Sequence, residues 1–290
     1  MNLPSVNIKQ LLEAGVHLGH KTFRWNPKMS KYIFGSKNSI HIIDLVQTLE
    51  MINSALVEIH KCISSGGKII FVSTKKQASE TVANLAKDTS QYYVNHRWLG
   101  GMLTNWKTIS NSIKYYKKLS EDLSKENKNF TKKEFLKMGV ERDKLERSLG
   151  GIANMKKTPD MIFIIDTNAE SLAVKEAIKL HIPIVAIVDT NSDPTGINFP
   201  IPGNDDARRS INLYCELIKE TIHDAQKNIS DSKEDEKKSE GEEIKNEVIA
   251  KPNNKDKFST AKPKKKVDVI KKSRSLFSKI QEFTSKKKSK

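Results

Sequence analysis

Carboxylates and histidines are the first side chains of this sequence that could hold a ligand. Five aspartates follow predicted strands or precede the last predicted helix: Asp166, Asp189, Asp193, Asp205 and Asp206. Parallel α/β sheets place their sites at this edge, and His17 and His20, three residues apart, could reach it. Imidazole nitrogen and carboxylate oxygen together suit one divalent ion. The same aspartates lie in turn and helix-capping sequences, so a structural role is the favoured interpretation and an ion the alternative.

Motifs of nucleotide-binding and hydrolytic enzymes are absent. The sequence contains no GxxxxGK[ST], GxGxxG, HExxH or GxSxG pattern. The predicted turn Ser73–Lys76 could hold a phosphate on helix-terminal amides, but this geometry suits an RNA phosphate equally well. A general acid–base pair would lack a substrate pocket. An enzyme or nucleotide-binding regulator is therefore the weaker hypothesis, which saturable binding of a nucleotide or flavin would support.

Two acid-free stretches combine cations with aromatic side chains. Residues 20–38 hold Lys21, Arg24, Lys28, Lys31 and Lys37 beside Phe23, Trp25, Tyr32 and Phe34, and residues 95–107 hold Arg97 and Lys107 beside Trp98 and Trp106. Cations neutralise RNA phosphates, and aromatic faces can stack on bases. We expect the cations to contact phosphate and the aromatic side chains to pack on the protein body.

The charge balance and the absence of targeting signals narrow the class of protein. The formal net charge of the 290 residues is +16, and a basic soluble chain most often meets nucleic acid. No apolar run approaches the ~20 residues that span a bilayer, and the first residues do not resemble a signal peptide. Cys62 and Cys215 form no CxxC motif. We expect a soluble cytoplasmic protein with no membrane partner.

Residues 229–290 are predicted to form a disordered charged tail. Asp231–Lys290 contains 19 basic and 11 acidic residues and few apolar ones, too few to bury a core. The tail is basic from about residue 251. Its basic end could follow ribonucleic acid, or the tail could be a solvated appendage, and the sequence favours neither.

Alternating strands and helices predict an α/β fold. The predicted elements are helices at Asn7–Gly15, at about Val46–Ser64, from Thr74 to about Lys87, from Thr167 to about Leu180 and at about Asp206–Asp224, with strands at Ser39–Asp44, Lys68–Val72, Met161–Ile165 and Ile184–Val188. Residues 17–38 fit neither type. Repeated βα units indicate a parallel sheet covered on both faces, a three-layer sandwich. Capping boxes are predicted at Thr74–Gln77, Thr131–Glu134 and Thr167–Glu170.

Residues 106–149 interrupt the α/β pattern with two apolar seams at helical spacing. One seam runs from Ile109 to Leu123 and the other from Phe135 to Leu149, around a polar turn at residues 124–129. This pattern predicts a protruding antiparallel coiled-coil hairpin. Its short seam buries little, so packing at its base or on a partner must help to stabilise it. The predicted body is then discontinuous, residues 1–105 and 150–228.

Six segments, in this order and spacing, carry a family resemblance over roughly residues 5–228. They are Gly15–His20, Trp25–Met29, Asn95–Trp106, Leu149–Gly151, Asp189–Pro194 and Ile201–Ala207. The chain resembles the bacterial small-ribosomal-subunit protein two family. The resemblance implies a flavodoxin-like body with a coiled-coil hairpin, and a structural protein rather than an enzyme.

The resemblance also implies partners. Members of that family lie between the head and body of the small subunit, contact its ribosomal RNA and neighbouring proteins, and help to dock ribosomal protein one, which captures messenger RNA. We therefore expect RNA contacts from the cations named above and from Lys114, Lys117 and Lys118 in the hairpin. No cofactor and no homo-oligomer are expected. A structural ion at His20, Asp189 and Asp205 stays the alternative interpretation, which the resemblance strengthens only modestly. A second role as a free RNA-binding regulator stays open.

Overall fold

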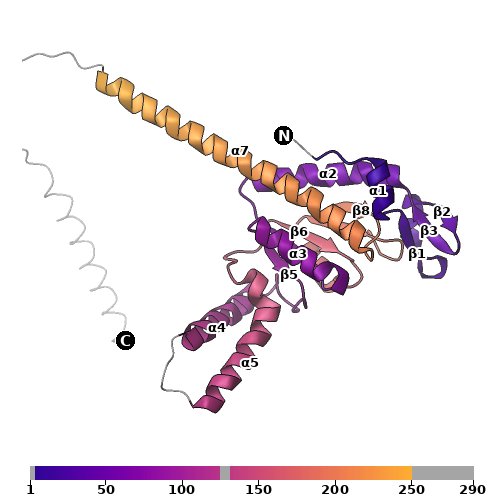
Figure 1. The fold of residues 1–290 in the computed structure, drawn as a ribbon, viewed down its shortest axis with the longest axis horizontal. Coiled ribbons are helices and arrows are strands. Elements are labelled where there is room, and N and C mark those ends of the chain that lie inside the picture. Colours follow the sequence, from indigo (N-terminus) through magenta and orange to yellow (C-terminus); the bar gives the residue numbers. More distant parts are fainter. Residues whose placement is uncertain (1–3, 125–130, 250–290) are drawn as a thin grey trace, which may run out of the picture. The chain divides into compact units, whose positions relative to one another are not determined.

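In the computed structural model, which describes residues 4–124 and 131–249, a five-stranded parallel sheet forms the centre of the fold (Figure 1). Its strands are β4 (Ile69–Val72), β5 (Tyr92–Val94), β6 (Met161–Ile165), β7 (Ile184–Val188) and β8 (Phe199–Pro202). Their spatial order is β5-β4-β6-β7-β8, which is the flavodoxin-like order 2-1-3-4-5. The expected three-layer α/β class is confirmed.

Helices cover both faces of this sheet, and each strand contributes side chains to both. The first face packs on α1 (Ile8–Ala14), α2 (Leu45–Ser64), α3 (Lys76–Asp88) and α7 (Arg208–Ile249). The second packs on α6 (Ser171–Lys179) and on the sheet-proximal ends of two further helices. In β4, Phe71 faces the first layer and meets the Phe163 ring edge-on at 5.6 Å, whereas Ile70 faces the second. Burial on both faces explains the uninterrupted apolar runs of these strands.

A smaller antiparallel sheet precedes the main one. Its strands β1 (Leu18–Lys21), β3 (Ile40–Ile43) and β2 (Ile33–Lys37) lie in the order β1-β3-β2. Only β3 matches a predicted strand, so the irregular structure expected for residues 17–38 is partly wrong. Both missed strands have shifted registers against β3, and such irregular pairing disrupts the alternation by which strands are recognised.

Two helices, α4 (Trp106–Ser124) and α5 (Lys132–Leu149), form the predicted insertion and pack together, with the Tyr115 hydroxyl donating to Glu141 Oε1 at 3.1 Å. The capping box at Thr131 is present. Ile109, Ile113 and Leu149 are buried in the second core layer, so packing at the base supports the pair as expected. The coiled-coil type of packing stays a prediction, and residues 125–130 of the turn lie outside the described residues.

The other two predicted capping boxes are wrong. Helix α3 begins with Lys75 as its N-cap and α6 with Glu170, and neither has a side-chain capping bond. Instead, the Thr74 backbone N–H donates to Glu170 Oε1 at 2.7 Å. Glu170, from the predicted box at Thr167–Glu170, therefore bonds to the backbone at the predicted box Thr74–Gln77. The two segments meet because they follow the neighbouring strands β6 and β4.

Helix α7 continues beyond its predicted end at about Asp224. It spans Arg208–Ile249, with side chains described up to Asn228, and no proline interrupts the chain before Pro252. The disordered tail stays a prediction, and residues 250–290 lie outside the described residues.

Among the described helices, none combines the length and apolarity needed to cross a membrane.

Candidate functional site

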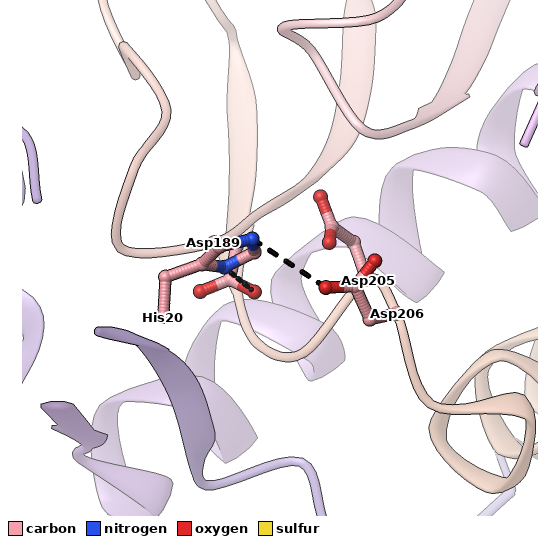
Figure 2. Close-up of side chains that lie close together, drawn as sticks. All are labelled: His20, Asp189, Asp205 and Asp206. Carbon is pink, nitrogen blue, oxygen red and sulfur yellow. Dashed lines mark ion pairs between the residues drawn. The ribbon is translucent and has the colours of Figure 1, made fainter. Parts of the chain in front are cut away.

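A cluster of acidic side chains lies where the parallel strands end. Asp166 follows β6, Asp189 follows β7, and Asp205 and Asp206 follow β8. His20 reaches them from β1, with Nδ1 2.9 Å from Asp189 Oδ2 and Nε2 3.4 Å from Asp206 Oδ2 (Figure 2). One donor atom from each of His20, Asp189, Asp205 and Asp206 lies within 4.8 Å of the others.

The backbone around β1 positions His20. The His20 N–H donates to Thr190 Oγ1 at 2.9 Å. A side chain at Gly19 would collide with Thr190, so glycine lets the two segments approach. The hydrogen bond to Asp189 raises the pKa of His20 above its ordinary value.

Lys75 is the cation at the centre of the cluster. Its Nζ lies 3.0 Å from Asp166 Oδ2, 2.7 Å from Asp205 Oδ1 and 2.6 Å from Asp206 Oδ1. Burial disfavours the ammonium, but the carboxylates more than offset this and raise the pKa of Lys75. Asp205 is fully buried, and burial together with the Asp189 and Asp166 charges raises its pKa to about 7. Its Oδ2 has no hydrogen-bond partner among the described residues.

This cluster fills the position where flavodoxin-like folds bind nucleotides, the gap between the ends of the first and third strands. Here those strands are β4 and β6. The Thr74 amide is bonded to Glu170, and Lys75 is bonded to three aspartates. Neither the amide nor the ammonium is available to a phosphate, and the surrounding carboxylates would repel one.

Of the candidate ligands named from the sequence, the structure brings His20, Asp189, Asp205 and Asp206 together, and Lys75 joins Asp166 to them. His17 is not part of the cluster, and its Nδ1 is buried without a described partner. Asp193 is also outside it: Lys28 Nζ lies 2.7 Å from Asp193 Oδ2 and lowers the pKa of that carboxyl to about 2.

The cations predicted to bind RNA are all solvent-exposed. They lie on the small sheet and its 3₁₀ turns (Lys21, Arg24, Lys28, Lys31, Lys37), around the start of α4 (Arg97, Lys107) and along α4 (Lys114, Lys117, Lys118). Among the described residues, Lys28 alone of these ten forms an ion pair.

The aromatic side chains divide into two groups. Tyr32 is 3% exposed and packs in the core as expected, whereas Trp25 is 40% exposed and packs only partly, with its ring centroid 5.5 Å from that of His41. Phe23 and Phe34 are 71% and 79% exposed, so the expectation of packing is wrong for them. Phe23 and Leu18 border an open hollow of about 490 Å³ that His20 also lines.

Glu176 on α6 is a functional candidate that sequence reasoning missed. Its carboxylate accepts hydrogen bonds from residues 98–104, the centre of the second basic stretch. Trp98 is buried and Trp106 half-buried, so both pack on the body. Glu176 is one of several charged residues on an amphipathic helix, and no local pattern distinguishes it.

The chain is similar to known proteins over most of its length. The model of the family described as Ribosomal protein S2 matches residues 11–225. The small ribosomal subunit protein uS2 of Parvibaculum lavamentivorans is 57% identical over 224 residues, covering 77% of this chain and 88% of the relative. The proteins of the same name from Sinorhizobium medicae and Rhizobium leguminosarum bv. trifolii are 59% and 60% identical, each over 75% of this chain and 86% of the relative.

Proposed function

Because the chain belongs to the ribosomal protein S2 family, it is a structural protein of the small ribosomal subunit and not an enzyme, and we propose that it binds the subunit's RNA through its exposed cations. Ribosomes are cytoplasmic in bacteria, and neighbouring ribosomal proteins are expected partners. The family needs no cofactor in general.

The distribution of charge carries this proposal. The acidic cluster is bonded internally to Lys75 and His20. Nine of the ten predicted cations are exposed without a described ion-pair partner. Exposed cations without partners are available to phosphates, and phosphate contacts fix how a protein is placed on RNA.

The mechanism is electrostatic scaffolding between the head and body of the subunit. Cations on the small sheet, at Arg97 and Lys107, and along α4 would neutralise phosphates of different RNA helices. The doubly covered sheet holds the first two groups in one body, so their RNA helices would be fixed relative to one another. Recognition would then follow RNA shape rather than base edges.

Sedimentation of a cell lysate through a sucrose gradient tests this proposal. We expect the chain to travel with the small subunit at moderate salt and to leave it at high salt, because salt weakens phosphate contacts. A chain that stays at the top of the gradient at every salt concentration would contradict the proposal.

Docking of ribosomal protein one is the second part of the proposal. Leu18, Phe23 and Phe34 are exposed apolar side chains on the small sheet and its turn, and such side chains mark protein interfaces. We expect F23A/F34A subunits to bind ribosomal protein one more weakly, whereas L172A on α6, also exposed, should have no effect. Equal binding by both variants would remove this surface from the interface.

A divalent ion at His20, Asp189, Asp205 and Asp206 is the third part. The residues fit an ion, because the buried Asp205 Oδ2 lacks a described partner and nitrogen with carboxylate oxygen suits zinc. The four aspartates have one ammonium among them, that of Lys75, and His20 would bind an ion through its neutral imidazole, so negative charge is left for the ion to neutralise. When bound, the ion would fix the small sheet to the strand ends.

A further inference from the structure

Glu176 receives five hydrogen bonds from one irregular segment. Its Oε1 accepts from Trp98 Nε1 at 3.1 Å and from the Gly101 N–H at 2.7 Å. Its Oε2 accepts from the Leu103 N–H at 2.9 Å, the Thr104 N–H at 3.0 Å and the Thr104 hydroxyl at 3.2 Å. These donors all belong to the connection between β5 and α4.

Three backbone amides of this segment have the Glu176 carboxylate as their hydrogen-bond acceptor. Residues 98–105 form neither helix nor strand, and besides these bonds to Glu176 the Met102 and Asn105 amides donate to the Leu99 and Gly101 carbonyls in turns. Successive N–H groups in such turns make a concavity that favours an anion. Burial opposes ionisation of Glu176, but the donated hydrogen bonds outweigh it and lower the pKa of the carboxyl.

The same segment separates two of the proposed RNA contacts. Arg97 precedes it and Lys107 follows it, both exposed. Trp98, Met102 and Leu103 are buried in the second core layer, so one side of the segment is fixed to the body. The spacing of the two cations is then set by the backbone conformation of residues 98–104.

We propose that Glu176 is a positioning residue for RNA binding, which fixes residues 98–104 so that Arg97 and Lys107 meet phosphates at a defined spacing. This inference rests on the proposed function. Glu176 itself does not touch RNA, and its carboxylate is already bonded to the segment.

The variant E176Q tests this role, because the loss of negative charge and the loss of positioning predict opposite changes in RNA affinity. Removing a carboxylate makes the protein more basic, which alone strengthens RNA binding. The glutamine amide, however, places a donor against some of the N–H donors, and the loosened segment should weaken binding about tenfold. E80Q removes the same charge from an exposed position on α3 and should bind equally or slightly more tightly. Binding to small-subunit ribosomal RNA is measured over a salt series.

A double-mutant cycle separates positioning from general destabilisation. If Glu176 acts through the two cations, E176Q should add little to the loss already caused by R97A/K107A. An E176Q effect that adds in full to that loss, or E176Q binding equal to wild type, overturns the inference. If E176Q does not fold, W98F, which removes one of the five donors, is measured in the same cycle. An unchanged affinity of folded W98F then overturns the inference as well.

The proposed function can fail separately. Wild-type binding without salt dependence would overturn RNA scaffolding as a whole. Loss of binding in variants of the small-sheet cations, with R97A/K107A unchanged, would keep the function and overturn only the positioning role of Glu176.

Discussion

At the residue scale, the acidic cluster at the strand ends is bonded internally, whereas the ten cations predicted to bind RNA are exposed. Asp205 is completely buried, yet Lys75 contacts it at 2.7 Å and shares its charge with Asp166 and Asp206. A buried carboxylate without such a partner would be costly. Because the acids are compensated from within, they detract less from the basic surface than their number suggests.

The small-sheet cations should carry part of the salt dependence of RNA binding. The triple variant R24A/K31A/K37A, which removes three exposed cations without a described ion-pair partner, should lower the log–log salt slope by about 2 to 3, since each neutralised phosphate contributes roughly 0.9. The control K61A/K157A/K219A removes three lysines that are ion-paired to Glu58, Asp160 and Asp88. If both triple variants show the wild-type slope, these cations do not contact phosphate.

The ion proposed for the acidic cluster would have a thermodynamic signature. Zinc that binds only the folded state should raise the free energy of unfolding of the wild type by about 2.7 kcal/mol at a hundredfold excess over the dissociation constant, and the unfolding midpoint should rise with it. D205N should lose this response, whereas D193N, outside the cluster, should keep it. A wild-type midpoint that does not change between EDTA and added zinc would exclude the ion.

The Glu176 carboxylate predicts a dependence of stability on acid pH. Its pKa is lowered in the folded state, so its contribution is present above the ordinary glutamate value of about 4.3 and is lost as pH falls through the lowered pKa. The difference in urea midpoint between wild type and E176Q should therefore be largest near neutral pH and shrink in acid. A difference that grows in acid would mean that folding raises the pKa of Glu176 instead of lowering it.

The sequence could identify residues of the site only where their position in the predicted fold was recognisable. His20, Asp189 and Asp205 could be proposed because strand ends meet at one edge. Lys75 lies in a turn for which the sequence predicts only phosphate binding by backbone amides, because the three aspartates that contact its ammonium follow two other strands, β6 and β8. Glu176 was missed because its five donors lie more than 70 positions away along the chain.

At the element scale, burial decides which strands a sequence can reveal. Buried on both faces, β4, β6 and β7 are continuous apolar runs and were predicted. The two outer strands β5 and β8 were missed, because one has three residues and the other includes Pro200 and Pro202. Proline is tolerated at a sheet edge but argues against a strand when only the sequence is read.

The base of the helical pair allows a matched test with two glycines. A side chain at Gly151 would overlap the Tyr93 carbonyl oxygen, whereas one at Gly139 in α5 would meet nothing within 4 Å. G151A should therefore lower the free energy of unfolding by about 1–3 kcal/mol. G139A should raise it by about 0.5–1 kcal/mol through helix propensity. Urea unfolding measures both, and equal effects of the two changes would contradict this account of the base.

At the scale of the whole molecule, the positive charge is unevenly divided along the chain. Residues 251–290 hold 15 basic and 3 acidic side chains, so this stretch provides most of the formal charge of +16. The body places its smaller excess on defined surfaces around a rigid sheet. Fixed cations can match the shape of one RNA, whereas charge density along a chain attracts any polyanion.

Removing residues 251–290 should consequently lower the affinity for RNA in general and raise the specificity for small-subunit RNA. We expect the truncated protein to bind an unrelated RNA duplex much more weakly and small-subunit RNA only moderately more weakly, so that the ratio of the two affinities rises. The unfolding midpoint should not change, because the described core clusters contain only residues up to Ala225. Both RNAs are titrated at the same salt concentration, since the electrostatic part of binding depends on it. A fall in the ratio of the two affinities would show that the tail itself recognises the ribosomal RNA. If the truncated protein keeps both the wild-type ratio and the wild-type affinities, the tail is a solvated appendage.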